Sequence, residues 1–174
     1  MNIDSICSIG AHCGIGPRIG VAATAGLLLA LVPSWLWPEH CVMPLPAAWS
    51  RVLGLLLLVL GGAFYAWSLR LLHRAWAQSR FASTGPFSAL RHPVYAAWIW
   101  LILPAIALLT QSWPYLLAPA LALWAFGRGI RNEEFAMRER FGAAYANYVR
   151  AVPGRILPRK HKQPTTITPP GNKP

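Results

Sequence analysis

The chain has 174 residues, of which 55% are hydrophobic and 12% carry a charge. Soluble domains contain about 25% charged residues, so this composition argues against a water-soluble globular protein and excludes a wholly disordered one. Sixteen lysines and arginines oppose five acids, which gives a net charge of +11. In a soluble protein that excess would indicate nucleic-acid binding. In an apolar chain it is typical of basic cytoplasmic loops, so we expect no nucleic-acid partner.

Four apolar stretches follow one another along the chain, at about 19–37, 52–69, 94–109 and 114–127. A helix needs about 20 residues to cross the hydrocarbon core of a bilayer, and the first two stretches meet that length. The last two are shorter and are joined by an uncharged break at 110–114, which is typical of a tight helical hairpin. We therefore predict an all-α integral membrane protein with about four transmembrane helices, the last two forming a short hairpin.

Basic residues are distributed unevenly between these stretches. Four arginines lie between the second and third stretches and ten lysines and arginines follow the fourth, whereas only Arg51 lies between the first and second. Cytoplasmic segments carry such an excess, so we predict that both termini are cytoplasmic, in a bacterial-type inner membrane. The predicted organisation is a cytoplasmic N-terminal tail at 1–18, a single membrane domain at 19–158 and a disordered basic tail at 159–174.

The cysteines give no sign of a metal or disulfide framework. Cys7, Cys13 and Cys41 are odd in number, so they cannot all pair within one chain. His12 beside Cys13, with Cys7 upstream, does not complete the closed ligand set that zinc favours. We expect no metal.

The segment 84–95 gathers groups that suit an anion. A glycine–proline pair at 85–86 is a turn signal, and Pro93 suits the first position of a helix because no N–H is needed there. His92 then lies near the N-cap, with Arg91 just before it. A guanidinium, an imidazole and the positive end of a helix favour a carboxylate or phosphate. The alternative is that Arg91 and His92 only flank the third span.

A second polar cluster interrupts an amphipathic helix predicted for the cytoplasmic segment 128–152. Its apolar residues recur at the spacing of one helix face: Ile130, Met137, Phe141, Tyr145, Tyr148 and Val152. Glu134 falls within this stripe, and a buried acid costs free energy unless a partner pairs with it. Two interpretations stay open, because Glu134 can pair across the fold or with Arg138 at i,i+4 while Glu133 is solvated. Gly142 is expected to bend or interrupt this helix.

Together the two clusters predict a site for an amphoteric nucleoside cofactor. The basic segment suits a carboxylate, and the two acids can accept hydrogen bonds from hydroxyl or amino groups. Aromatic rings that could cover a flat heterocycle are Trp98, Trp100, Tyr145 and Tyr148. No G-x-G-x-x-G lies between a strand and a helix, so a soluble Rossmann-type domain is not expected.

Four motifs in the C-terminal half resemble one known family. They are R-H-P-V-Y at Arg91–Tyr95, E-E at Glu133–Glu134, F-G-A-A-Y-A-N-Y at Phe141–Tyr148 and V-P-G-R-I-L-P at Val152–Pro158. In this order, behind the expected spans, they resemble the isoprenylcysteine carboxyl methyltransferase family, which belongs with the membrane phospholipid methyltransferases. The resemblance covers about 80–158. It implies an integral membrane methyltransferase that uses S-adenosyl-L-methionine.

The resemblance also implies roles for individual residues. The cofactor-binding residues would be Arg91, His92, Pro93, Tyr95, Glu133 and Glu134. The first four would hold the methionine part of the cofactor and the two acids its polar groups, and Arg91 and Glu134 are the predicted catalytic residues. The chain departs from the family pattern twice. Ala97 stands where the family usually has glycine, and Gly154 is inserted in the last motif, which shifts Arg155 by one position.

The expected partners are the lipid bilayer and a lipophilic methyl acceptor, either a small molecule or a lipidated molecule. A carboxylate or thiolate acceptor needs no general base, whereas an amine does, and the chain offers few bases, so a carboxylate or thiol is favoured. Three alternatives stay open: a phospholipid N-methyltransferase, a nicotinamide-dependent membrane reductase of related architecture, and a non-catalytic membrane protein. The oligomeric state stays open as well.

Overall fold

The computed structural model describes residues 14–159, which are helical apart from their links and contain no strand, only an isolated bridge between Val42 and Ser112. The helices are α2 (Gly16–Leu36), α3 (Ala47–Ala77), α4 (Pro93–Ala97), α5 (Leu103–Leu109) and α6 (Leu117–Ala151), with 3-10 turns at Pro38–His40, Gly85–Ser88 and Trp113–Leu116. The all-α prediction is confirmed for this part of the chain. The predictions for Cys7, His12 and Cys13, and for the tail beyond Arg159, lie outside the described residues.

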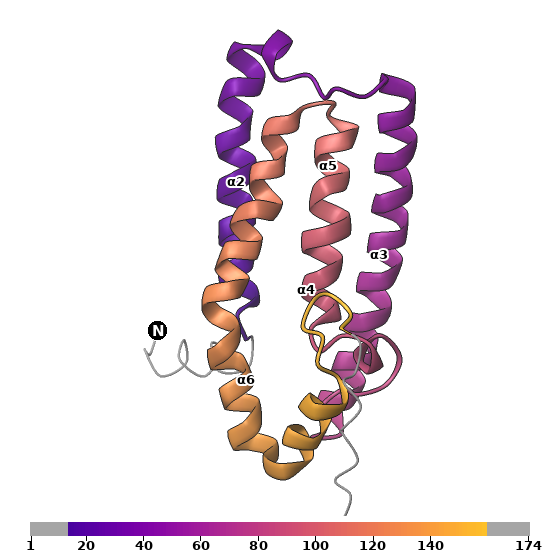
Figure 1. The fold of residues 1–174 in the computed structure, drawn as a ribbon, viewed down its shortest axis with the longest axis vertical. Helices are drawn as coiled ribbons and strands as arrows, with labels where there is room; N and C mark the ends of the chain where they lie inside the picture. Colours follow the sequence, from indigo (N-terminus) through magenta and orange to yellow (C-terminus); the bar gives the residue numbers. More distant parts are fainter. Residues whose placement is uncertain (1–13, 160–174) are drawn as a thin grey trace, which may run out of the picture.

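The helices form an up-and-down bundle (Figure 1). α2 lies along α6, and α3 lies along α4 and α5. The links 37–46 and 110–116 lie at one end of the bundle. The start of α2, the link 78–92, the last turns of α6 and the segment 152–159 lie at the other end, which we call the site end. Both ends of the described chain therefore meet there.

Two helices, α2 and α3, are long and apolar enough to cross a membrane by length and composition. Only 22% and 17% of their most apolar windows are buried inside the protein, so most of this apolar surface faces outward. An outward apolar surface of that extent is typical of a membrane protein rather than of a soluble monomer. The rod Pro93–Leu109 is apolar but shorter, with 17 residues. The count of four spans stays a prediction.

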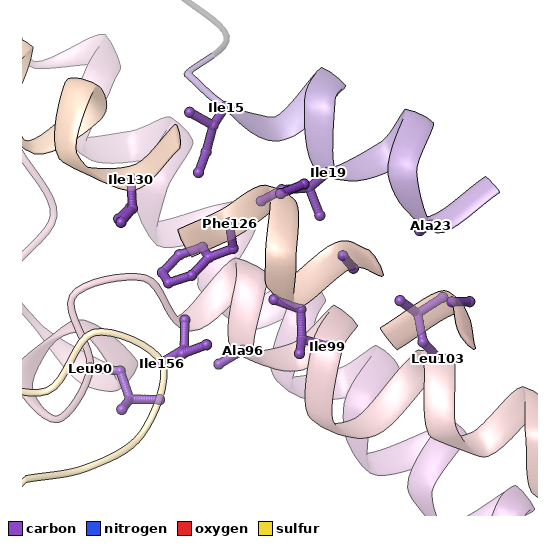
Figure 2. Packing of buried hydrophobic residues seen from close by; sticks show 13 residues of the cluster. Ile15, Ile19, Ala23, Leu90, Ala96, Ile99, Leu103, Phe126, Ile130 and Ile156 are labelled. Carbon is purple, nitrogen blue, oxygen red and sulfur yellow. The ribbon is translucent and has the colours of Figure 1, made fainter. Parts of the chain in front are cut away.

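Small residues set the spacing between the helices. A Cβ added to Gly26 of α2 would lie 2.6 Å from the Ala118 Cα of α6, and one added to Gly61 of α3 would lie 2.7 Å from the Leu101 Cβ. Helices packed in lipid rely on such close approach, because the surrounding lipid is as apolar as their side chains. Figure 2 shows the resulting core near the site end, where residues at the start of α2, in the rod Pro93–Leu109 and in α6 interdigitate: Ile15, Ile19, Ala96, Ile99, Phe126 and Ile130.

One π-helical turn (Trp98–Ile102) joins α4 to α5 and has a local cause. Pro104 has no N–H, and its ring would clash with the carbonyl four residues earlier in a regular α-helix. The backbone widens just before it, so that the Leu103 N–H bonds to the Trp98 carbonyl, five residues back. The wider turn keeps Pro93–Leu109 continuous, as π-bulges do in other helices.

Two boundaries differ from the sequence predictions. The expected short span 114–127 and the amphipathic segment 128–152 are not separate helices, because α6 runs from Leu117 past Gly127 as far as a kink at Gly142 (φ 53°, ψ −131°), beyond which a further helical stretch reaches Ala151. The predicted interruption at Gly142 is therefore confirmed. It falls at a glycine because only glycine adopts that conformation at little cost. At the other end, Ile15 belongs to the buried core and residues 16–18 belong to α2 rather than to an N-terminal tail.

Candidate functional site

The segment before α4 is held in place by the end of the chain. His92 is the N-cap of α4 and Pro93 is its first residue, as predicted. The backbone N–H groups of Arg91 and His92 donate to the carbonyls of Gly154 and Arg155, each at 2.9 Å. The two segments, 62 positions apart at Arg91 and Pro153, are also joined by the Arg91 guanidinium, which donates to the Pro153 carbonyl. This pairing fixes the backbone positions of Arg91 and His92, from which their side chains extend into the site.

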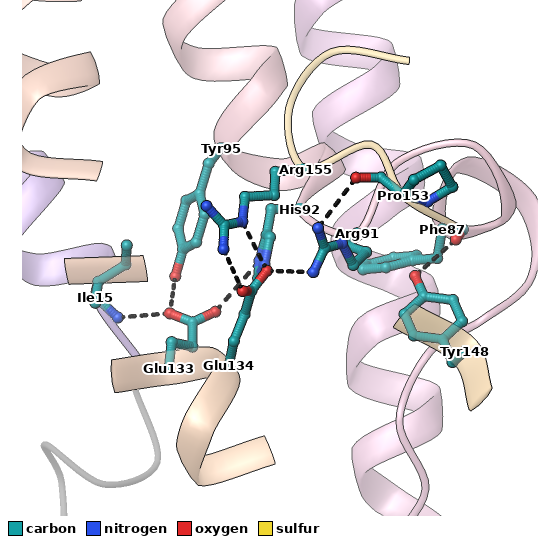
Figure 3. Close-up of polar contacts among 10 residues, drawn as sticks. All are labelled: Ile15, Phe87, Arg91, His92, Tyr95, Glu133, Glu134, Tyr148, Pro153 and Arg155. Carbon is teal, nitrogen blue, oxygen red and sulfur yellow. Dashed lines mark hydrogen bonds and ion pairs between the residues drawn. The ribbon is translucent and has the colours of Figure 1, made fainter. Parts of the chain in front are cut away.

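Glu134 lies between two guanidinium groups, as Figure 3 shows. Its Oε1 accepts from Arg91 at 2.6 Å and from Arg155 at 3.0 Å, and its Oε2 accepts from Arg155 at 2.7 Å. The side chains of Glu134 and Arg91 are only 7% and 8% exposed. The interpretation that pairs Glu134 with Arg138 is therefore wrong. Pairing across the fold compensates the buried acid, which explains why a carboxylate is tolerated within the apolar stripe.

Glu133 is held by a different set of groups. Its Oε2 accepts from the Ile15 backbone N–H at 2.8 Å and from the Tyr95 hydroxyl at 3.0 Å. Its Oε1 lies 3.5 Å from Nδ1 of His92. The alternative in which Glu133 is solvated is wrong, because its side chain is 19% exposed and accepts hydrogen bonds from Ile15, the N-cap of α2, and from Tyr95 of α4.

The electrostatics of the cluster favour its charged forms. Burial tends to raise the pKa of Glu134, but the nearby His92 imidazole, the hydrogen bonds from Arg155 and the charges of Arg91 and Arg155 lower it to about 2. For Glu133, burial is again opposed by His92, Ile15 and Tyr95, and the net pKa is lowered. Burial alone would lower the pKa of His92, but both carboxylates outweigh it and raise this pKa. The imidazole therefore gains a proton more readily than an ordinary histidine.

The aromatic residues named from the sequence divide into two groups. Tyr145 and Tyr148 lie against Phe81 at the site end, with ring centroids 5.7 and 5.3 Å away, and the Tyr148 hydroxyl donates to the Phe87 carbonyl. Trp98 instead packs edge-on against Tyr65 and is 38% exposed. Trp100 lines an apolar groove of about 250 Å³. Only the tyrosines are therefore placed beside the polar cluster.

Two contributors to this cluster were not selected from the sequence. Arg155 was noted only as a displaced position in the last motif, yet it makes two hydrogen bonds to Glu134. The Ile15 N–H is a backbone group and has no side-chain signature. Gly154, the inserted residue, is required where it stands, because a Cβ there would lie 2.5 Å from the Leu157 carbonyl oxygen. Ala97 is fully buried, so the second departure also lies inside the fold.

All six predicted site residues meet at the site end. Arg91, His92, Pro93 and Tyr95 come from the start of the α4 rod, and Glu133 and Glu134 come from α6. Two buried nitrogens of the cluster, Nε of Arg91 and Nε2 of His92, have no hydrogen-bond partner. Buried donors of this kind are rare in native folds and identify groups with bonding capacity left over.

Comparison with known proteins agrees with this geometry. A model of the isoprenylcysteine carboxyl methyltransferase (ICMT) family matches residues 51–139, which include Arg91, His92, Glu133 and Glu134. No curated protein matches the chain. The family assignment implies methyltransferase activity, and together with the two apolar helices it indicates a membrane protein. Because the family model covers just over half of the chain, this protein belongs to the isoprenylcysteine carboxyl methyltransferase family.

Proposed function

We propose that this protein is an integral membrane methyltransferase that uses S-adenosyl-L-methionine to methylate a lipophilic acceptor, with the cluster at the site end as its cofactor site. The observation that carries the proposal is the buried Arg91–Glu134 ion pair, 2.6 Å long, with Arg155, His92 and Glu133 around it. Three separate segments of the chain, at 91–92, 133–134 and 155, converge to build it. Ionisable groups assembled in this way are commonly functional.

The residues present fit the proposed cofactor. The methionine part of S-adenosyl-L-methionine carries a carboxylate and an ammonium group, and its ribose carries two hydroxyls. Two guanidinium groups and an imidazole suit the carboxylate, and Glu133 and Glu134 suit the ammonium and hydroxyl groups. The unpartnered nitrogens of Arg91 and His92 supply donors that the protein itself does not use. With His92 protonated, three cationic groups face two carboxylates, which leaves an excess that favours an anionic ligand group.

The chain's own residues would bind and orient rather than perform acid–base chemistry. The cofactor, when bound, supplies an already activated methyl group. Arg91 and Arg155 would hold a carboxylate, while Glu134, fixed between them, keeps both guanidinium groups directed into the site. Orientation of this kind can lower a barrier by about 7–11 kcal/mol. We therefore assign Arg91 and Glu134 the central roles.

The protonation states of the cluster favour a carboxylate or thiolate acceptor over an amine. A general base works best with a pKa near the working pH. The pKa values of Glu133 and Glu134 are lowered, which makes both carboxylates weak bases. The pKa of His92 is raised, so at neutral pH its imidazole is less available to accept a proton. An acceptor that arrives already ionised needs none of these groups.

The proposed topology follows from the arrangement of the helices. With four crossings and cytoplasmic termini, the site end would face the cytoplasm of a bacterial-type inner membrane. Both ends of the described chain lie at that end (Figure 1), as this orientation requires. The outward apolar surfaces of α2 and α3 would contact lipid. A lipophilic acceptor could then reach the site from the bilayer.

The test is methyl transfer by the purified protein. It would be incubated with methyl-labelled S-adenosyl-L-methionine and, in separate reactions, a prenylcysteine, a fatty thiol and an aminophospholipid, and the products identified by mass spectrometry. We expect labelled ester or thioether, and strong loss of label in Glu134→Gln. The matched control is Glu139→Gln, an exposed acid of the same helix. Labelled phospholipid amine would instead identify a phospholipid N-methyltransferase.

Calorimetry separates the remaining alternatives. Wild-type protein should bind S-adenosyl-L-methionine and not NADPH. Binding of NADPH alone would establish a nicotinamide-dependent reductase. Binding of neither, with no label transferred, would indicate a non-catalytic membrane protein and overturn the proposal.

A further inference from the structure

The residues just before α2 form part of the cluster, although the sequence places them in a tail. The Ile15 N–H donates to Glu133 Oε2 at 2.8 Å, beside the Tyr95 hydroxyl at 3.0 Å. A carboxylate oxygen has two lone pairs, so these two donors saturate Oε2. The other oxygen, Oε1, faces Nδ1 of His92 at 3.5 Å, beyond an ordinary hydrogen-bond length. Glu133 is thus fixed through one oxygen and has the other left for a ligand.

The Ile15 N–H is itself held rigidly. Ile15 is 5% exposed, and its side chain belongs to the core cluster of Ile19, Phe126 and Ile130 (Figure 2). A Cβ added to Gly129 would lie 2.8 Å from the Ile15 Cγ2, so α6 leaves room for this side chain and for no more. The anchor is therefore built from both α2 and α6.

Position 14 also fits only glycine. The φ of Gly14 is +59°, which non-glycine residues rarely adopt, and a Cβ there would lie 2.6 Å from Glu133 Oε2 and 3.2 Å from the Tyr95 hydroxyl. The backbone at Gly14 therefore lies close against the Glu133 carboxylate. A close approach and a left-handed turn at the same residue are expected where a segment is shaped to a site.

We propose that Gly14–Ile15 is a positioning segment that fixes the Glu133 carboxylate for binding the cofactor, an inference that rests on the proposed function of the cluster. Without the Ile15 N–H, Oε2 keeps only the Tyr95 hydroxyl, and the carboxylate is free to turn away from its observed position. Oε1, which lies 3.5 Å from His92 Nδ1, is then no longer fixed where a ligand can reach it. The segment acts through Glu133 and does not touch the transferred group.

Two substitutions at one position isolate the backbone donor. Ile15→Pro removes the N–H and the side chain, and the φ of −87° at Ile15 lies close to the proline range. Ile15→Ala removes the side chain and keeps the N–H, so it is the matched control. We expect Ile15→Pro to bind S-adenosyl-L-methionine at least about tenfold more weakly than Ile15→Ala, the size expected for a hydrogen bond to a charged group.

A cofactor-free measurement keeps this inference separate from the proposed function. The chain has only four glutamates, so a carboxyl-labelled sample can be resolved by NMR, with the Glu133 signal identified by its loss in Glu133→Gln. The groups facing Glu133 are His92 and Tyr95 from the α4 segment, the neighbouring Glu134 and the Ile15 N–H. Removing that N–H should raise the titration midpoint of Glu133 in Ile15→Pro, whereas Ile15→Ala keeps the wild-type midpoint.

Equal midpoints and equal affinities in the two variants would overturn the positioning role. If wild-type protein binds no S-adenosyl-L-methionine, the proposed function fails, while the Glu133 titration still decides the role of the segment. If Ile15→Pro does not fold, Gly14→Ala takes its place. Its control is Gly20→Ala, where an added Cβ meets nothing within 4 Å. A raised Glu133 midpoint in Gly14→Ala alone would support the proposal, and no difference from Gly20→Ala would refute it.

Discussion

Replacing Glu134 by glutamine tests whether the cluster holds the site end together. The substitution keeps the shape of the side chain and removes its charge from between Arg91 and Arg155, with which it makes contacts of 2.6 and 2.7 Å. Arg91 would then remain buried, at 8% exposure, without a compensating charge. Because an unpaired buried charge is strongly unfavourable, the free energy of unfolding should fall.

The magnitude follows from the burial of each partner. Removing one partner of a buried ion pair costs about 3–5 kcal/mol, and the Arg91–Glu134 pair belongs to that class. Arg155 is 41% exposed, so its pair with Glu134 contributes no more than about 1 kcal/mol. Glutamine keeps one oxygen that can accept from Arg91, which places the expected loss near the lower limit, at about 3 kcal/mol.

The assay is equilibrium unfolding of the purified protein in a fixed detergent, without cofactor. Glu139→Gln, which removes an exposed charge from the same helix, should stay within about 0.5 kcal/mol of wild type. A double-mutant cycle with Arg91→Gln should give a coupling of at least about 1 kcal/mol, because the two side chains are in direct contact. If Glu134→Gln is as stable as Glu139→Gln, the ion pair does not hold the fold and the reasoning is wrong.

Three further outcomes follow from the same contacts. Stability should fall as pH drops below 4.5, because Glu134 has a pKa of about 2 in the folded protein and its stabilising contribution is lost as it becomes protonated. Stability should also fall as pH rises through the raised pKa of His92, a loss that His92→Gln abolishes. Acid and alkaline unfolding curves measure both losses. Gly61→Ala should be destabilising by about 1–3 kcal/mol, since its Cβ would lie 2.7 Å from Leu101, whereas the adjacent Gly62→Ala, which meets nothing within 4 Å, should be neutral or slightly stabilising by thermal unfolding. Tyr148→Phe should cost about 1 kcal/mol of unfolding free energy through the lost hydrogen bond to the Phe87 carbonyl, and an unchanged unfolding midpoint would refute that contribution.

The core of the candidate site could be predicted because local rules place its residues. Pro93 defines the first position of a helix, which puts His92 at the N-cap and Arg91 before it. The period of the α6 stripe shows that Glu134 lies on the buried face, so a cationic partner is required. Neither rule names that partner. The choice of Arg91 over Arg138 depends on the distance between two helices, which no local pattern encodes.

Other parts of the site could not be predicted, for reasons that differ from residue to residue. The Ile15 donor is a backbone N–H, and every non-proline residue has one. Arg155 follows Gly154, where an added Cβ would lie only 2.5 Å from the Leu157 carbonyl oxygen, and such a contact between segments leaves no periodic signal in the sequence. The extension of α6 beyond Gly127 was missed because hydropathy ends there, whereas the helix continues as far as the kink at Gly142 and a further helical stretch reaches Ala151.

The cluster also joins the two helix pairs of the bundle, and this separates the roles of its two arginines. Glu134 comes from α6, which packs on α2, and Arg91 leads into α4, which packs on α3. Arg91 is buried, whereas Arg155 is 41% exposed and can release Glu134 at lower cost.

Arg155→Gln should therefore lower the unfolding free energy by about 1 kcal/mol or less and still weaken S-adenosyl-L-methionine binding roughly tenfold, since a charged hydrogen-bond donor is lost. Arg91→Gln should lower both the unfolding free energy and the affinity for S-adenosyl-L-methionine by larger amounts. Calorimetric affinities set beside unfolding curves decide the matter, and an Arg155→Gln protein that is markedly unstable but binds the cofactor normally would assign Arg155 to the fold rather than to the ligand.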